Sequence, residues 1–142
     1  MDRNKALLAE HGKEIFDAAA KAGVDVAFEA SVGGGIPILR SMREGLAANR
    51  IDRVLGIVNG TTNYMLSEME ATGEPFAAVL ARAQALGYAE ADPTFDVDGI
   101  DAAHKLTLLA AMAFGADLTH RDVPTEGIRA LAPVDFEAAR EF

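Results

Sequence analysis

The richest source of chemistry in this sequence is residues 90–105, EADPTFDVDGIDAAHK, where an aspartate and a lysine stand four positions apart near the end. At that spacing Asp101 and Lys105 share one face of a helix. A solvent-exposed ion pair is the simplest interpretation, and such pairs are common and weak. However, the predicted helix over residues 99–115 is apolar nearly all round, which is typical of a buried helix. A lysine that emerges from it into a cleft can serve as a general acid or base, held in position by the carboxylate.

A predicted loop ahead of this helix, residues 88–98, carries four carboxylates: Glu90, Asp92, Asp96 and Asp98. One interpretation is a solvated acidic loop that holds at most a weak cation. The other is that one or two carboxylates recognise an ammonium group on a substrate. The spacing is not that of an EF-hand, and nothing in the chain has zinc-ligand spacing. For His104 a structural role is favoured over a metal-binding one.

Two glycine-containing turns stand before predicted helices. Residues 33–37, GGGIP, lie between a predicted strand and a helix. Glycines there allow close approach to the backbone, so the segment could hold a phosphate or a cation. The pattern matches neither common glycine-rich nucleotide motif. In the second turn, residues 59–62 (NGTT), the hydroxyls of Thr61 and Thr62 can cap a helix, or its free N–H groups can hold a carboxylate.

The elements that position these groups are two predicted strands, residues 24–29 and 51–59, and a larger number of helices. The helices are predicted over residues 5–22 (with a break near Gly12), 38–48, 61–71, 76–86, 99–115 and 135–142. Two strands alone make a poor sheet, so we expect partner strands from another chain or from residues outside this sequence. The predicted fold is an α+β domain with a mixed sheet flanked by helices.

Composition excludes several classes of protein. The net charge of −9 repels phosphate backbones, so we expect no nucleic-acid partner. The chain has no cysteine, which excludes disulfides and thiolate chemistry. The longest apolar run, residues 106–116, falls well short of the roughly 20 residues that a membrane span needs. The charged N-terminus is not a secretory signal, so we expect a cytoplasmic protein.

Four motifs, taken together and in order, resemble the homoserine dehydrogenase family: NKALLA at residues 4–9, FEASVGGGIP at 28–37, NGTTNY at 59–64 and GYAEADPTFDVDGIDAAHK at 87–105. The resemblance implies an enzyme that interconverts L-homoserine and L-aspartate 4-semialdehyde with NADP or NAD, on the route to threonine, methionine and isoleucine. Related dehydrogenases that oxidise aldehydes through a thioester need a cysteine, which this chain lacks.

The resemblance also assigns roles to residues. Lys105 corresponds to the catalytic lysine, Asp101 to its supporting carboxylate and Lys5 to a second active-site lysine. The substrate contacts that it implies are Glu90 (to the amino group), Asp96, Tyr88, Gly60 and Thr61. The cofactor contacts that it implies are Asn4, Lys5 and Gly34. Backbone carbonyls for a monovalent cation such as Na⁺ correspond to Glu29, Val32, Gly34 and Ile36.

The sequence departs from the family pattern at both ends, where most of the dinucleotide-binding domain and further strands of the catalytic region are expected. We therefore interpret residues 1–35 as the closing segment of a dinucleotide-binding domain. Residues 36–142 are interpreted as the catalytic and dimerisation domain, incomplete at its C-terminal end, and the resemblance implies a homodimer. On this basis the chain alone is expected to be poorly active. The alternative is a non-catalytic dimerisation or folding fragment of the same enzyme.

Overall fold

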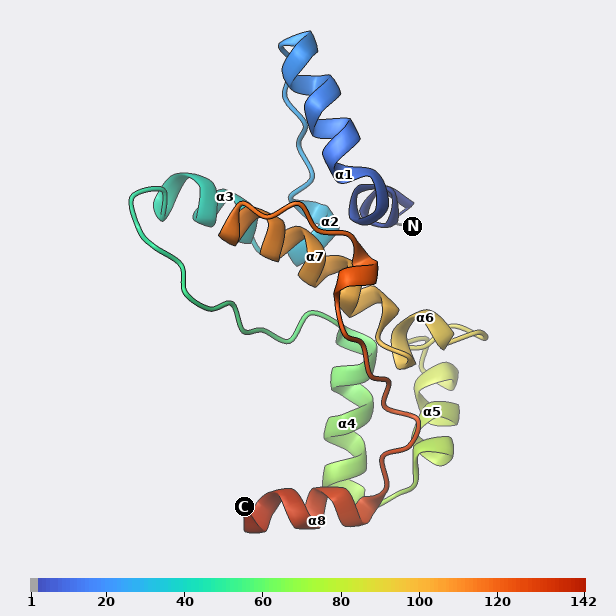
Figure 1. The fold of residues 1–142 in the computed structure, drawn as a ribbon. Helices are drawn as coiled ribbons and strands as arrows, with labels where there is room; N and C mark the ends of the chain where they lie inside the picture. Colours follow the sequence, from blue (N-terminus) through green and yellow to red (C-terminus); the bar gives the residue numbers. More distant parts are fainter. Residues whose placement is uncertain (1–2) are drawn as a thin grey trace. The chain divides into compact units, whose positions relative to one another are not determined.

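The computed structural model describes residues 3–142, with side chains from Lys5 onward. In that range the chain is built from helices joined by loops (Figure 1). The elements are α1 (Arg3–Ala22), α2 (Ala30–Gly33), α3 (Ile38–Arg40), η1 (Ser41–Gly45), α4 (Gly60–Thr72), α5 (Phe76–Ala85), α6 (Thr94–Val97), α7 (Ile100–Phe114), η2 (His120–Asp122) and α8 (Pro133–Glu141). None of the helices in this described part is long and apolar enough to cross a membrane.

The chain divides into two compact units. The first contains the chain up to Val58 together with Ala102–Pro124, and the second contains Asn59–Asp101 together with Thr125–Phe142. Helix α7 therefore begins in the second unit and continues in the first. Each unit has its own apolar core, so each is described separately.

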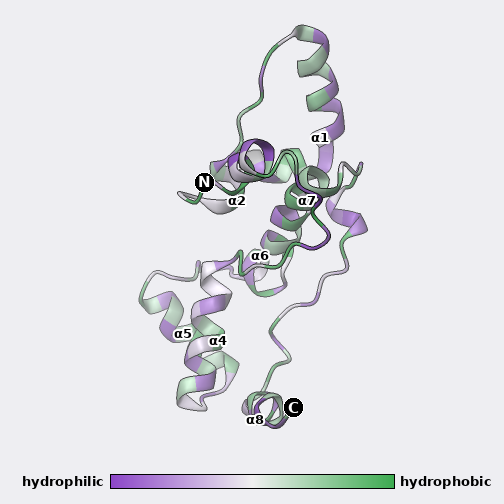
Figure 2. Cartoon of the chain, turned by 90° about the vertical axis from the view of Figure 1, so that its left-hand side faces the viewer, coloured by the Kyte–Doolittle hydropathy of each residue, from purple (hydrophilic) through white to green (hydrophobic). Residues whose placement is uncertain are grey.

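The core of the first unit gathers residues from α1, α2, α3, η1 and α7. Its buried members are Leu8, Val32, Leu39, Met42, Leu108 and Leu109. Helix α1 is amphipathic, as its alternating purple and green bands show (Figure 2). The break predicted near Gly12 is confirmed, because the backbone leaves helical geometry at His11 (φ −122°, ψ 19°). Gly23 ends the helix at φ 67°, a left-handed conformation that glycine adopts at little cost.

The second unit is organised by α4 and α5, which run side by side as a helical hairpin (Figure 1). Its buried core residues are Met65, Met69, Val79, Ala83, Ala89 and Val97. Gly73, at φ 70°, closes α4 as the sequence predicted, and its backbone N–H donates to the Met69 carbonyl. The loop before α7, predicted to be irregular throughout, contains the single-turn helix α6.

The predicted α+β fold with a mixed sheet is wrong for residues 3–142, where the structure contains no strand. Neither predicted strand forms in this range: residues 24–28 and 51–59 have no regular secondary structure, and Glu29 has helical dihedral angles (φ −49°, ψ −50°). A strand is defined by hydrogen bonds to a neighbour, and alternating hydrophobicity alone does not supply one. In the segment 51–58, Val54 packs on the first core, whereas Leu55 and Ile57 are 83% and 80% exposed.

The helix predicted over residues 38–48 is shorter and differently wound. After α3 the chain continues as η1, a π-helical turn in which the Leu46 N–H donates to the Ser41 carbonyl. The Ser41 hydroxyl donates to the Pro37 carbonyl at 2.7 Å, a contact of the kind that competes with regular helical hydrogen bonds. The Ser41 N–H also donates to the Pro37 carbonyl, at 3.0 Å, so the regular backbone hydrogen bond is kept beside the hydroxyl contact.

Candidate functional site

A buried amide joins two carboxylates at the start of α4 in the second unit. The Nδ2 of Asn59 donates to Asp96 Oδ1 at 2.7 Å and to Asp101 Oδ2 at 2.9 Å. Its Oδ1 accepts from the backbone N–H of Thr62 at 2.8 Å and from the Thr62 hydroxyl at 2.8 Å. Asn59 is therefore the N-cap of α4, the role that the sequence assigned to Thr61 and Thr62.

The electrostatics of this cluster favour a cation. Asp101 is only 3% exposed, and a carboxylate in that position needs hydrogen-bond donors. Asn59 supplies one donor to each carboxylate without adding a positive charge. The two accepting oxygens are held on the two N–H bonds of one amide, which point in different directions and so keep the oxygens apart. The cluster can thus attract an ammonium group, because its negative charge is not cancelled by the amide.

The NGTT turn is also tied to the predicted substrate loop. The Thr61 hydroxyl donates to the Tyr88 carbonyl at 2.8 Å, and the rings of Tyr64 and Tyr88 pack with centroids 4.7 Å apart. A Cβ placed on Gly60 would meet no atom within 4 Å, so the backbone there is open to a ligand. The structure therefore joins Thr61, next to Gly60, to the backbone of Tyr88; contact of these residues with a substrate stays a prediction.

Glu90 is exposed and is held through its backbone, since its carbonyl accepts from Gln84 Nε2 at 3.0 Å. The other two carboxylates of the loop have structural partners. Asp92 accepts from the Thr94 N–H at 3.1 Å, and the hydroxyl and N–H of Thr94 hold the pKa of Asp92 below its usual value. Asp98 forms an ion pair with Arg129. Of the four carboxylates, Glu90 and Asp96 are therefore better placed than these two to meet a ligand.

Lys105 lies on α7, one turn after Asp101, and is partly buried in the first unit. Its Nζ donates to the Val58 carbonyl at 2.7 Å. This contact holds the ammonium at the end of the extended segment that leads to Asn59. Lys5 is partly buried in the first turns of α1, and the side chain of Asn4 lies outside the described residues.

The glycine-rich segment has a structural role that the sequence did not reveal. Both carboxylate oxygens of Glu29 accept backbone N–H groups, from Leu39 and from Arg40, each at 2.7 Å. The side chain thus caps the start of α3 from ten residues upstream. Of the predicted cation ligands, the carbonyl of Glu29 accepts from the Val32 N–H at 3.3 Å and that of Ile36 from the Ile38 N–H at 2.8 Å. Gly34 adopts φ 59°, and a Cβ there would meet nothing within 4 Å.

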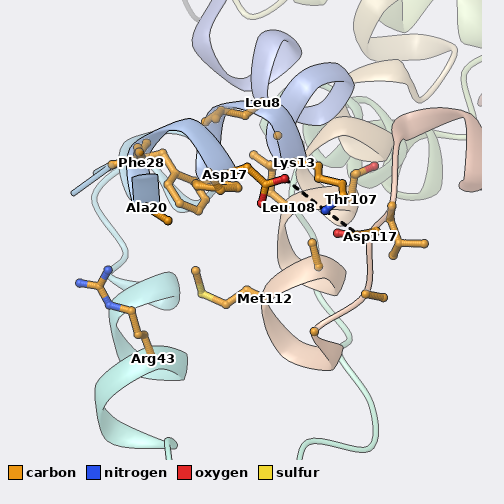
Figure 3. A pocket seen from close by; sticks show the side chains of 18 of the residues that line it. Leu8, Lys13, Asp17, Ala20, Phe28, Arg43, Thr107, Leu108, Met112 and Asp117 are labelled. Atoms are coloured by element: carbon orange, nitrogen blue, oxygen red, sulfur yellow. Dashed lines mark hydrogen bonds and ion pairs between the residues drawn. The ribbon is translucent and has the colours of Figure 1, made fainter. Parts of the chain in front are cut away.

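A cavity of about 600 Å³ lies in the first unit between α1, the extended segment that follows it, and α7 (Figure 3). Its wall is mainly apolar, with Phe28 and Met112 among its members. Lys13 lies within 3.3 Å of Asp17 and 3.5 Å of Asp117, and these carboxylates raise the pKa of Lys13. None of the residues predicted to carry chemistry lines this cavity, so the candidate site is the set of groups described above.

Comparison with known proteins identifies the family. The family model described as homoserine dehydrogenase matches residues 37–142. A homoserine dehydrogenase of Pseudomonas aeruginosa is 61% identical over 136 residues, covering 96% of this chain and 31% of that protein. One of Neisseria gonorrhoeae is 56% identical over 139 residues, covering 98% of this chain and 32% of its own length. The chain belongs to the homoserine dehydrogenase family, and it spans about a third of the length of these relatives.

Solved structures agree with this assignment. The crystal structure of a homoserine dehydrogenase from Thiobacillus denitrificans matches with a TM-score of 0.94 at 57% identity, covering 97% of this chain and 32% of that one. A hyperthermophilic archaeal homoserine dehydrogenase in complex with NADPH matches with a TM-score of 0.81 at 31% identity, covering 90% of this chain and 39% of that one. The helical arrangement is therefore one that this region adopts within larger proteins of the family.

Proposed function

We propose that this chain carries the substrate-binding and proton-transfer residues of a homoserine dehydrogenase that interconverts L-homoserine and L-aspartate 4-semialdehyde. The observation that carries the proposal is the pair of carboxylates joined by Asn59, next to the turn formed by Gly60 and Thr61. Family membership supports it, and so does the start of the family match at residue 37, close to the predicted domain boundary after residue 35. The route to threonine, methionine and isoleucine and a cytoplasmic location remain predictions.

Proton transfer is assigned to Lys105. Reduction of the aldehyde builds negative charge on its oxygen, and an ammonium group placed there stabilises the charge and donates the proton. In the oxidative direction the neutral amine removes the hydroxyl proton. Asp101, one turn earlier on α7, is proposed as the carboxylate that supports Lys105, and Lys5 is proposed as the second lysine.

Substrate recognition is assigned to the acidic loop and the NGTT turn. Glu90 and Asp96 are proposed to bind the amino group, since carboxylates favour an ammonium partner. Tyr88, Gly60 and Thr61 are proposed to border the substrate, and the open backbone at Gly60 suits close approach.

A nicotinamide cofactor, NADP or NAD, supplies the hydride when bound. The residues of this chain proposed to contact it are Asn4, Lys5 and Gly34, and the open space around Gly34 fits such a contact. Binding of NADPH by the archaeal relative supports NADP as one candidate. A monovalent cation such as Na⁺ is proposed at the carbonyls of Glu29, Val32, Gly34 and Ile36.

We also propose a homodimer, supported by the exposed Leu55 and Ile57 on an extended segment whose backbone has no ladder partner in the described residues. The non-catalytic alternative, a dimerisation or folding fragment, shares this feature. Homoserine binding separates the catalytic function from the assembly function, because a dimerisation or folding fragment has no reason to bind homoserine.

Calorimetric titration of this chain with L-homoserine tests the proposed function. We expect saturable binding that weakens in Glu90→Gln and Lys105→Ala. The matched controls are Glu137→Gln and Lys21→Ala, which remove the same charges from exposed positions on α8 and α1. Absence of binding by the unmodified, folded chain would contradict the proposal and leave the assembly module as the better account.

A further inference from the structure

Every hydrogen-bonding position of the Asn59 side chain is used. Its two N–H groups go to Asp96 and Asp101, and its oxygen accepts twice from Thr62. The orientation of the amide follows from its partners: ionised carboxylates only accept, and the Thr62 N–H only donates. Asn59 itself is 8% exposed, so water does not compete appreciably for these contacts.

The three residues come from three separate elements of the second unit. Asn59 precedes α4, Asp96 lies on the four-residue helix α6, and Asp101 lies in the first turn of α7. A one-turn helix has little stability of its own, so the position of Asp96 depends on what holds its side chain. The like charges of Asp96 and Asp101 would favour separation, and the shared amide opposes it.

We propose that Asn59 is a positioning residue of the homoserine-binding site, an amide that holds Asp96, a proposed contact of the substrate amino group, in place relative to Asp101, the proposed supporting carboxylate of Lys105. This inference rests on the proposed function. Asn59 acts through the two carboxylates and needs no contact with substrate. Asn59 also caps α4, so one side chain fixes the position of the NGTT turn relative to the two carboxylates.

Two substitutions separate the positioning role from the capping role. Asn59→Ser and Asn59→Asp both keep a side-chain oxygen that can cap a helix. Asn59→Ser removes the amide donors, and Asn59→Asp replaces them with an acceptor that faces two carboxylates. Asn63→Asp is the matched control, because it adds the same charge in the first turn of α4 at an exposed position.

The first readout is an NMR pH titration of the ligand-free chain. In the unmodified chain, the Asn59 side-chain amide resonances should shift as Asp96 and Asp101 take up protons, and those of Asn63 should shift less. In Asn59→Asp the titration midpoint of at least one carboxyl of the trio should rise relative to the unmodified chain, since three converging charges favour a bound proton. Asn63→Asp should leave the titration midpoints of Asp96 and Asp101 unchanged. Asn59 resonances that stay constant across the titration would overturn the inference without any variant having to fold.

The second readout is the affinity for L-homoserine. We expect Asn59→Ser to bind roughly tenfold more weakly, the loss expected when one or two hydrogen bonds no longer order the site, with its helical circular dichroism retained. Equal binding by folded Asn59→Ser and the unmodified chain would overturn the positioning role and leave the proposed function standing. If the unmodified chain does not bind L-homoserine, the proposed function fails and the substrate role of Asn59 fails with it. The NMR titration still shows in that case whether the Asn59 amide is hydrogen-bonded to Asp96 and Asp101.

Discussion

Replacing Gly127 by alanine should destabilise the second unit severely. A Cβ at this position would lie 2.7 Å from the Val97 carbonyl oxygen and 2.8 Å from the Cα of Asp98, both of them backbone atoms that cannot rotate away. The segment 125–129 must therefore move, and the hydrogen bond from the Ile128 N–H to the Val97 carbonyl, 2.8 Å long, must stretch or break.

The magnitude follows from two contributions. Forced overpacking costs about 1–3 kcal/mol, and the loss of a backbone hydrogen bond adds about 1 kcal/mol. We therefore expect Gly127→Ala to lower the free energy of unfolding by about 2–4 kcal/mol, a large share of the stability of a small unit.

Urea unfolding followed by tyrosine fluorescence measures this change. The chain has two tyrosines and no tryptophan, and both Tyr64 and Tyr88 lie in the second unit, so the signal reports that unit. Gly60→Ala is the control in the same unit, since a Cβ there meets no atom within 4 Å and φ is not positive, and it should not be destabilising. If the free energy of unfolding of Gly127→Ala lies within about 0.5 kcal/mol of the value for the unmodified chain, the reasoning from this close contact is refuted.

Three further predictions test other parts of the structure. Glu29→Ala should cost about 1 kcal/mol by removing the cap of α3, measured by thermal unfolding; an unchanged midpoint would argue against the cap. Met69→Ala should cost about 2–5 kcal/mol in urea because Met69 is fully buried, whereas the exposed Val134→Ala should cost little. Hydrogen bonds from Thr119 lower the pKa of Asp122 from its usual 3.8, so this stabilisation is present above pH 3.8 and is lost as the pH falls below it. Asp122→Ala should therefore be less stable than the unmodified chain at neutral pH and approach it in acid; a constant difference would contradict the assignment.

The helices could be predicted well because their signals are local. Gly23, Gly73 and Gly87 all adopt positive φ just past the ends of helices that the sequence placed there. The predicted sheet is wrong because strand pairing is not a local property. Hydrophobic alternation in residues 24–29 describes one strand, but pairing is a property of two segments, and these residues have no ladder partner in the described range.

The same distinction separates the parts of the site. Asp101 and Lys105 could be placed one turn apart on a single helix from spacing alone, and α7 contains both. The Asn59 contacts to Asp96 and Asp101 span 37 and 42 residues, so no local pattern announces them. The signal that was available is the preference of asparagine for the N-cap before Gly-Thr-Thr, which would have placed Asn59 rather than the threonines at the start of α4.

The cap of α4 also affects the chemical stability of this chain during storage. Asn59 is followed by Gly60, the dipeptide in which a backbone nitrogen most readily attacks the side-chain amide, expels ammonia and forms a cyclic imide that water opens to aspartate or isoaspartate. Folding restrains this reaction, because four hydrogen bonds hold the amide in place. Chains that spend time unfolded lose that protection, and each event turns a donor between two carboxylates into a third carboxylate. A stored preparation would then accumulate molecules one dalton heavier, damaged at the position that ties the acidic loop to α4.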